Sequence, residues 1–227
     1  MLMLVVALAA AFMFLRSPYF YVTQVEVHGL RTVSAAEIVA WSGIGSGVLI
    51  WAVEPAAVAR RVEGHPAVAG AWVTRRWPNR IRIDILERDP VAAIEAEAVW
   101  YLVDGQGVAF RVVDEPPPDL PEIRGGSAGA PVLGRTLPAP LVNAARLAAY
   151  LRQYGIHWVE AVQSEAGDLT LWLEGDVPVY FGPADLDPER KLAVVDTLWS
   201  TWRADAARVR YMDVRNPQHP AVRTDSQ

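Results

Sequence analysis

Cysteine is absent from this 227-residue sequence. The chain therefore has no disulfide, no thiolate-bound zinc and no thiol nucleophile, and its redox compartment is not indicated. An excess of basic charge is also missing. Lys and Arg together number 21 against 26 Asp and Glu, a formal net charge of −5, and Lys191 is the single lysine. Because nucleic-acid-binding proteins usually carry a strongly basic surface, we expect no nucleic-acid partner.

Signatures of catalysis and metal binding are missing as well. The four histidines stand singly, outside the H-x-x-x-H and H-E-x-x-H spacings of metal sites, and no G-x-S-x-G motif is present. The carboxylate pair Glu165 and Asp168 keeps an exported hydrolase open as an alternative, but the EAGD sequence that contains both is typical of a turn. We expect no enzymatic activity, no cofactor, no metal site and no small-molecule substrate.

Apolar residues, by contrast, are abundant at 52%, and the first fifteen residues contain no polar side chain before Arg16. A helix that is apolar on every side is not expected on the surface of a soluble domain. We predict a transmembrane anchor over residues 1–16, although fifteen residues at about 1.5 Å each fall short of a bilayer core of about 30 Å. A preceding segment with a basic residue would complete the length and place the N-terminus in the cytoplasm.

A cleaved signal peptide is the alternative interpretation of this N-terminal run. Its apolar region is typically about 7–15 residues long, and Ala7-Leu8-Ala9 resembles a cleavage site. However, no basic segment precedes the run, and cleavage there would leave an apolar stub on the mature chain. The anchor is therefore favoured.

Residues 19–89 have the pattern of a small α+β domain. Residues 19–27 are aromatic and β-branched, which predicts a strand. Ser34 and Glu37 form a capping-box pattern at the start of one short helix, and Pro55 suits the first position of a second.

A hairpin completes this domain. The strand expected over residues 68–76 is followed by the turn sequence Trp77-Pro78-Asn79. Isoleucine then alternates with charged residues from Arg80 to Ile85, which predicts one buried and one charged face. The order is strand, helix, helix, strand, strand.

Residues 90–215, after Asp89-Pro90, predict a mixed β domain with flanking helices. Strands are expected at 99–103, 108–113, 158–163, 169–173, 177–181 and 208–214, and helices at about 141–151 and 186–204. The second helix places Leu192, Val195, Trp199 and Trp202 on one face. Residues 216–227 are polar, contain Pro217 and Pro220, and are expected to form a C-terminal tail.

Three stretches, in order, resemble the FtsQ/DivIB family of bacterial cell-division proteins. Residues 66–91 (PAVAGAWVTRRWPNRIRIDILERDPV) are similar to the end of that family's POTRA domain. Residues 103–110 resemble its V-D-x-x-G-x-x-F hairpin, and residues 211–215 (YMDVR) resemble its Y-[VI]-D-[LV]-R strand near the C-terminus. The apolar N-terminus also matches the family in position.

The resemblance implies a non-enzymatic adaptor in the inner (cell) membrane at the division septum. Such a protein crosses the membrane once, with its POTRA and β domains outside the cytoplasm. It joins FtsB- and FtsL-like division proteins and helps to recruit and regulate septal peptidoglycan synthesis. A POTRA-containing envelope assembly or secretion protein is the alternative, but the residues after Phe181 are too few for the outer-membrane domain that this class needs.

The resemblance also implies where the partners bind. Partner-strand addition at the C-terminal sheet edge maps to Tyr211, Asp213, Arg215, Ala221 and Val222. Because Pro217 and Pro220 lack backbone donors, we expect the added strand to pair on the far side or to begin at Ala221.

A second binding surface is expected on the POTRA hairpin, at Val73, Arg75 and Trp77. The arginines around this hairpin have two interpretations. They form either an ordinary solvated face, which we favour, or a docking surface for an acidic segment or anionic lipid headgroups.

Overall fold

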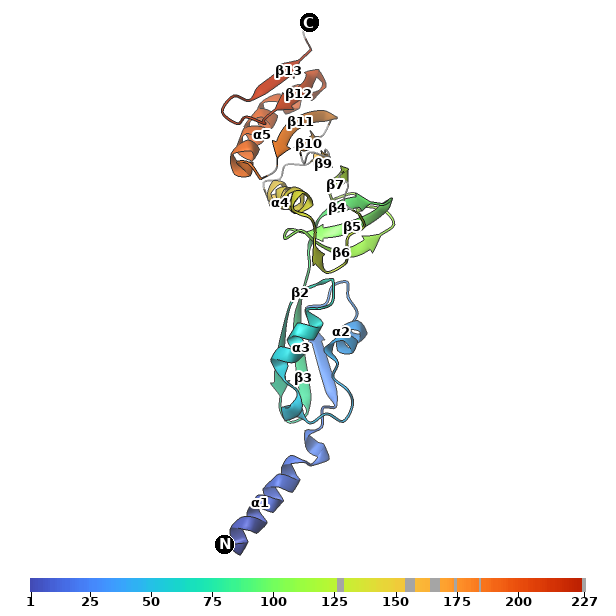
Figure 1. Cartoon of the computed structure of the whole chain (residues 1–227), viewed down its shortest axis with the longest axis vertical. Helices are drawn as coiled ribbons and strands as arrows, with labels where there is room; N and C mark the ends of the chain where they lie inside the picture. The colour runs from blue at the N-terminus through green and yellow to red at the C-terminus, as the bar shows by residue number, and fades with distance from the viewer. Residues whose placement is uncertain (126–128, 154–157, 164–167, 174, 184, 226–227) are drawn as a thin grey trace. The chain divides into compact units, whose positions relative to one another are not determined.

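The computed structural model describes residues 1–225 except 126–128, 154–157, 164–167, 174 and 184 (Figure 1). The chain divides into two compact units, Met1–Arg88 and Asp89–Gln227. Each unit has its own sheet, and each is described by itself below.

The first unit begins with helix α1 (Leu2–Leu15), whose side chains are exposed along its whole length. The transmembrane anchor expected over residues 1–16 corresponds to this helix of 14 residues, and within the described residues no helix is both long enough and apolar enough to cross a membrane.

The strand expected over residues 19–27 is shorter than predicted. The 3-10 turn η1 (Pro18–Phe20) takes its first residues, and β1 covers Gln24–His28. The physical reason is local, since Pro18 has a backbone suited to the first position of a helical turn and the Ser17 hydroxyl accepts a hydrogen bond from the Tyr19 N–H.

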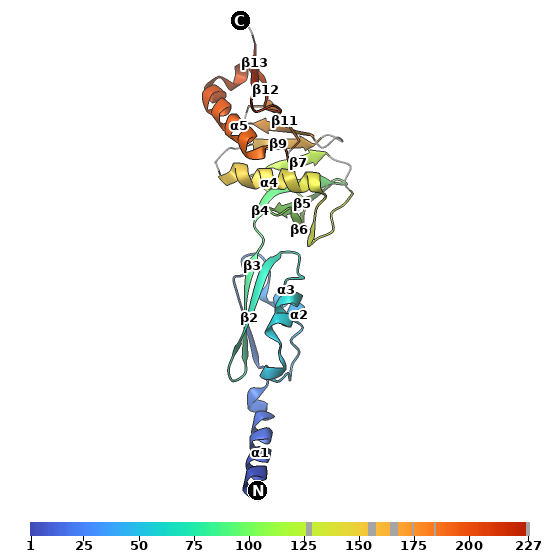
Figure 2. The same ribbon diagram turned by 60° about the vertical axis from the view of Figure 1, so that its left-hand side comes forward.

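The sheet of the first unit has the order β1-β3-β2, with β2 (Val68–Arg76) antiparallel and β1 parallel to β3 (Arg80–Glu87). Helices α2 (Ala35–Ser42) and α3 (Pro55–Val62) lie on the same side of this sheet (Figure 2). The predicted hairpin, the Ser34–Glu37 capping box and the start of α3 at Pro55 are all confirmed. Ile38, Val58, Val62, Ile81 and Ile83 are buried in the core between the helices and the sheet.

A buried carboxylate joins the end of β3 to the loop between β1 and α2. Glu87, at the end of β3, accepts hydrogen bonds from the backbone N–H groups of Arg31 (2.6 Å), Thr32 (3.0 Å) and Val33 (3.1 Å), and from the Thr32 hydroxyl (2.6 Å). Burial alone would raise the pKa of Glu87, but these hydrogen bonds outweigh it and lower the pKa to about 2. Glu87 thereby fixes the loop between β1 and α2.

The second unit contains a ten-stranded mixed sheet. Its strands are β4 (Pro90–Ala96), β5 (Val99–Asp104), β6 (Val108–Val113), β7 (Glu122–Gly125), β8 (Arg135–Thr136), β9 (Trp158–Gln163), β10 (Asp168–Leu173), β11 (Val177–Pro183), β12 (Val209–Asp213) and β13 (Ala221–Thr224). Their order in space is β13-β12-β11-β10-β9-β7-β4-β5-β6-β8. Strand β13 therefore forms one edge of this sheet, next to β12.

Helices α4 (Ala139–Gln153) and α5 (Pro188–Trp202) pack on this sheet and share one hydrophobic core with it. The apolar face predicted for the last helix is confirmed, because Leu192, Val195 and Trp199 are buried and Trp202 is half-buried. Lys191 is also buried. Its Nζ donates a hydrogen bond to the Pro183 carbonyl oxygen (2.9 Å), and burial lowers its pKa.

Candidate interaction surface at the C-terminal sheet edge

Strand β12 carries one buried and one accessible face, and a β-bulge decides which residues lie on each. Val209, Met212 and Val214 are all buried in the core. In a regular strand Val209 and Met212 would point to opposite faces, because they are three positions apart. The register against β13 shifts between Val209 and Tyr211, so Arg210 is the extra residue. This bulge places Tyr211 and Asp213 on the accessible face.

The C-terminal tail expected over residues 216–227 contributes a strand, which corrects the expectation of a free edge at β12. Met212 is opposite Val222 and Asp213 is opposite Ala221 in an antiparallel pair, so the edge of β12 is occupied by the chain itself. The Asp225 N–H donates to the Arg208 carbonyl oxygen (2.9 Å), and the side chains of Arg210 and Asp225 form an ion pair.

The two prolines permit this pairing because they lie before the ladder and not within it. The intervening segment turns at Asn216, whose side-chain oxygen accepts from the Gln218 N–H (3.1 Å) and whose carbonyl oxygen accepts from the His219 N–H (3.1 Å). Pro217 and Pro220 thus remove donors that the β12–β13 ladder does not use.

At this end of the sheet the edge strand is consequently β13, and within the described residues no strand pairs beyond it. Because the Asp225 N–H faces β12, alternation along the strand turns the main-chain groups of Arg223 and Ala221 inward and those of Val222 and Thr224 outward. The Val222 side chain packs against the core cluster. Val222 and Thr224 therefore present the N–H and C=O groups that an additional strand would pair with.

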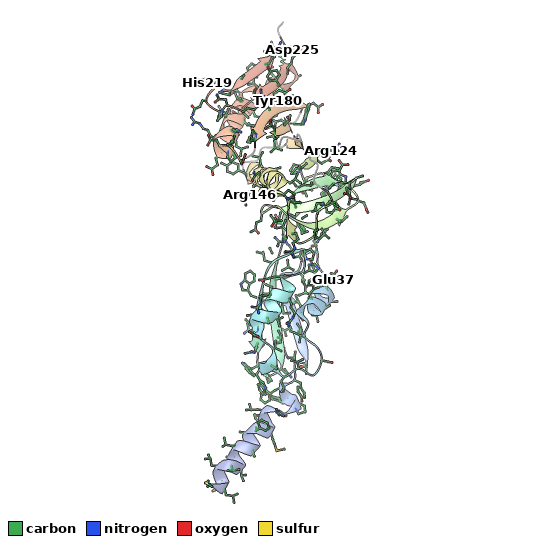
Figure 3. The ribbon with its side chains drawn as sticks, in the orientation of Figure 1. Glu37, Arg124, Arg146, Tyr180, His219 and Asp225 are labelled. Atoms are coloured by element: carbon green, nitrogen blue, oxygen red, sulfur yellow. The ribbon has the colours of Figure 1, made fainter. Side chains whose placement is uncertain are left out.

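Aromatic and charged groups lie beside this edge on the accessible face of the sheet. The rings of Tyr180 and Tyr211 are 5.4 Å apart, and the Arg215 guanidinium lies 5.8 Å from the centre of the Tyr180 ring. Arg215 also donates to the Asp213 carboxylate (2.5 Å), which lowers the pKa of Asp213. Tyr180, His219 and Asp225 are labelled in this part of the molecule (Figure 3).

The three hairpin residues expected to form a second surface have different environments. Val73 is buried in the core. Arg75 donates to the carbonyl oxygens of Val53 (2.6 Å) and Trp51 (3.4 Å). Trp77 is exposed, with 58% of its surface accessible. The structure therefore leaves Trp77 accessible and ties the other two to the fold.

Trp72 is a further exposed aromatic residue, outside the predicted binding surfaces. Ala71 and Val73 on either side of it are buried, so alternation along β2 turns Trp72 to the open face of the sheet, where 58% of it is accessible. The same alternation was visible in the sequence and would have identified it.

The described part of the chain contains no group of three or more histidine, cysteine, aspartate or glutamate side chains placed to hold a metal ion. Of the two carboxylates weighed for hydrolysis, Asp168 is the exposed first residue of β10 and Glu165 lies outside the described residues. A surface hollow between α4 and α5 has Arg146 and Tyr150 on one side and Asp185 and Glu189 on the other.

Comparison with known proteins identifies both units. The family model described as POTRA domain, FtsQ-type, matches residues 20–88. The family model described as cell division protein FtsQ/DivIB, C-terminal, matches residues 92–215, which is more than half of the chain. The chain belongs to the FtsQ/DivIB family. The resemblance seen in the sequence is confirmed, and the match over residues 92–215 favours it over the envelope-secretion alternative.

Relatives named cell division protein FtsQ match this family member over most of its length. The protein of Anaeromyxobacter sp. is 28% identical over 90% of this chain and 71% of its own length. The protein of Myxococcus fulvus is 29% identical over 93% of this chain and 76% of its own length. The protein of Chloroflexus aurantiacus is 30% identical over 95% of this chain and 78% of its own length. Strand β13 lies beyond residue 215, where the FtsQ/DivIB match ends.

Proposed function

We propose that this FtsQ/DivIB-family protein is a non-enzymatic adaptor of the division machinery that accepts a partner strand at β13. The partners are FtsB- and FtsL-like division proteins, and the adaptor helps to recruit and regulate septal peptidoglycan synthesis. The observation that carries the proposal is the outward-facing main chain of Val222 and Thr224 at the end of a ten-stranded sheet.

Strand addition suits this edge better than the opposite one. An added strand obtains its affinity from main-chain hydrogen bonds and its specificity from alternate side chains. β13 offers four residues, whereas β8 at the other end of the sheet spans two. The Tyr180–Tyr211 pair lies beside β13, and Arg223 of β13 is exposed opposite Tyr211, so apolar and acidic side chains on the partner strand would be favoured.

The proposed location is the inner membrane at the septum, with the N-terminus on the cytoplasmic side and both units outside the cytoplasm. The exposed apolar surface of α1 supports membrane attachment. Attachment would confine the protein with its membrane-bound partners, so that a modest affinity at β13 suffices.

A proline at position 224 tests the proposal. The Thr224 N–H faces away from β12, so Thr224→Pro removes an edge donor while keeping the β12–β13 ladder. We expect at least a tenfold loss of binding to a co-expressed FtsB-like partner in a pull-down, with the circular dichroism spectrum and Tm unchanged.

Thr224→Val is the matched control, because it removes the hydroxyl and keeps the N–H. We expect it to bind as the parent protein does. Full partner binding by Thr224→Pro would contradict strand addition at this edge.

A further inference from the structure

A continuous row of aromatic rings runs from the end of α1 to the tip of the β2–β3 hairpin. The ring centres of Phe14 and Phe20 are 5.3 Å apart, those of Phe20 and Trp51 are 4.7 Å apart, and those of Trp51 and Trp77 are 5.9 Å apart. The Tyr19 ring lies 5.2 Å from Phe20. Residues from α1, η1, the 3-10 turn η2 (Ile50–Ala52) and the hairpin turn are thus brought together within the first unit.

The row is accessible on its outer side. Tyr19 is 59% exposed and Trp77 is 58% exposed, while Phe20 and Trp51 are half-buried. The row also continues the apolar surface of α1, since Phe12 and Leu15 in the last turns of that helix are exposed. A group of contacting aromatic rings with this much accessible surface marks an interaction site more than an ordinary surface.

Hydrogen bonds hold the parts of this row in place. The Arg75 guanidinium donates to the carbonyl oxygens of Trp51 (3.4 Å) and Val53 (2.6 Å), which fixes the η2 segment against β2. The Thr23 N–H donates to the Asn79 carbonyl oxygen (2.9 Å), which fixes the hairpin tip against the chain after η1. The rings therefore form a preformed surface, so their ordering costs little when they bind.

The chemistry of the row and of α1 indicates a lipid surface as its occupant. α1 is apolar around its whole circumference, which suits hydrocarbon better than a one-sided protein groove. Tyr and Trp favour the headgroup level of a membrane, where the ring is in an apolar layer and the polar atom stays hydrated. Arg16 directly follows α1, and its guanidinium lies 4.6 Å from the centre of the Phe12 ring, so a positive charge that can pair with lipid phosphate stands at the end of the helix next to the row.

We propose that Tyr19, Phe20, Trp51 and Trp77 form an aromatic platform that rests among lipid headgroups and holds the tip of the POTRA hairpin against the membrane surface. This goes beyond the partner-binding role of β13, and it rests on the membrane attachment through α1 proposed above. The platform sets the orientation of the first unit. The end of α1 and the tip of the hairpin are two separate points of this unit, and both are held at the membrane surface.

The absence of cysteine from the chain makes the proposal directly testable. Trp77→Cys, labelled with a bimane fluorophore in the full-length protein, reports on the platform. Trp72→Cys is the matched control. Trp72 is exposed to the same extent, 58%, and precedes Trp77 by five positions, roughly 16 Å of chain at about 3.3 Å per residue.

Both labelled proteins are reconstituted into phosphatidylethanolamine–phosphatidylglycerol vesicles that contain a lipid with a nitroxide on its headgroup. We expect at least threefold stronger quenching at position 77 than at position 72. Equal quenching at the two positions, or none at position 77, would overturn the proposal.

Two further measurements separate the platform from simpler explanations. A label on Tyr19→Cys, which lies outside the hairpin, should be quenched as strongly as the label at position 77. Weak or no quenching at position 19 would contradict a shared platform. Quenching at position 77 should also persist in neutral phosphatidylcholine vesicles, because aromatic insertion does not need anionic lipid. Loss of this quenching in neutral vesicles would show that the contact depends on attraction between Arg16 and anionic lipid, and it would refute the aromatic platform.

Discussion

The two units fix the last strand of their sheets in different ways. In the first unit, Glu87 at the end of β3 is buried and receives backbone hydrogen bonds from Arg31, Thr32 and Val33. In the second unit, β13 is held at the outside of the sheet by its ladder and by an exposed pair, Arg210 and Asp225. The first arrangement suits a rigid support, and the second suits an edge that remains open to a partner.

The difference is energetic as well as geometric. Backbone donors that surround a buried carboxylate are shielded from water. Removal of the carboxylate therefore leaves these donors without a hydrogen-bond acceptor. An exposed ion pair is screened by solvent and salt and contributes about 0–1 kcal/mol. Changes at Glu87 should therefore affect stability far more than changes at the ion pair beside β13.

The largest expected effect comes from Glu87→Gln. The fall in the pKa of Glu87 from 4.5 to about 2 corresponds to about 3 kcal/mol of preferential stabilisation of the carboxylate. A neutral amide loses that stabilisation and directs its own N–H groups at other donors. We expect the first unit to lose about 3 kcal/mol of stability, measured by hydrogen exchange of residues 31–33 and β3.

Glu26→Gln is the control in the same unit. Glu26 pairs with Arg80 at 3.3 Å near the surface, and its loss should cost less than about 0.5 kcal/mol. Equal destabilisation by the two substitutions would show that Glu87 does not lock the unit.

A smaller effect is expected from acid. Because folding lowers the pKa of Glu87, its contribution is fully present above pH 4.5 and is lost as the pH falls toward about 2. At pH 3 the loss should be about 2 kcal/mol relative to pH 6. Exchange rates in the first unit of the parent protein and of Glu87→Gln should converge over this range, and parallel pH profiles would contradict the assignment.

Sequence patterns predicted the parts of the fold that depend on neighbouring residues. The alternating isoleucines of β3, the Ser34–Glu37 capping box and the apolar face of α5 were all found as expected. Each of these patterns depends on local backbone or side-chain geometry, and tertiary contacts did not change the structure that the local geometry favours. The start of β1 was missed because Ser17 and Pro18 favour a local turn over the β propensity of the residues that follow.

The candidate site was less predictable because it depends on which strands become neighbours. Side-chain types in Ala221–Thr224 do not show that the chain turns back onto β12, and the polar composition of residues 216–227 favours a tail over a strand. The bulge at Arg210 also places Val209 and Tyr211 on opposite faces of β12, although strict alternation along the strand would put them on the same face. Likewise, the bond from Arg75 to the Val53 carbonyl joins residues 22 positions apart, so an apparent surface arginine belongs to the fold.

The smallest expected effect tests the open edge directly. Arg210→Ala removes the exposed ion pair with Asp225 but keeps the hydrogen bond from the Asp225 N–H to Arg208, because that bond uses main-chain atoms. An exposed pair of this kind is worth a few tenths of a kcal/mol, so amide exchange in β13 should accelerate only about twofold. The exchange of β12 and β11, which are protected by the core beneath Met212 and Val179, should not change. A tenfold acceleration that extends into β12 would show instead that the Arg210–Asp225 ion pair, and not the β12–β13 ladder, holds β13 in place. Strand β13 would then detach readily from β12 and would not be a stable surface for strand addition.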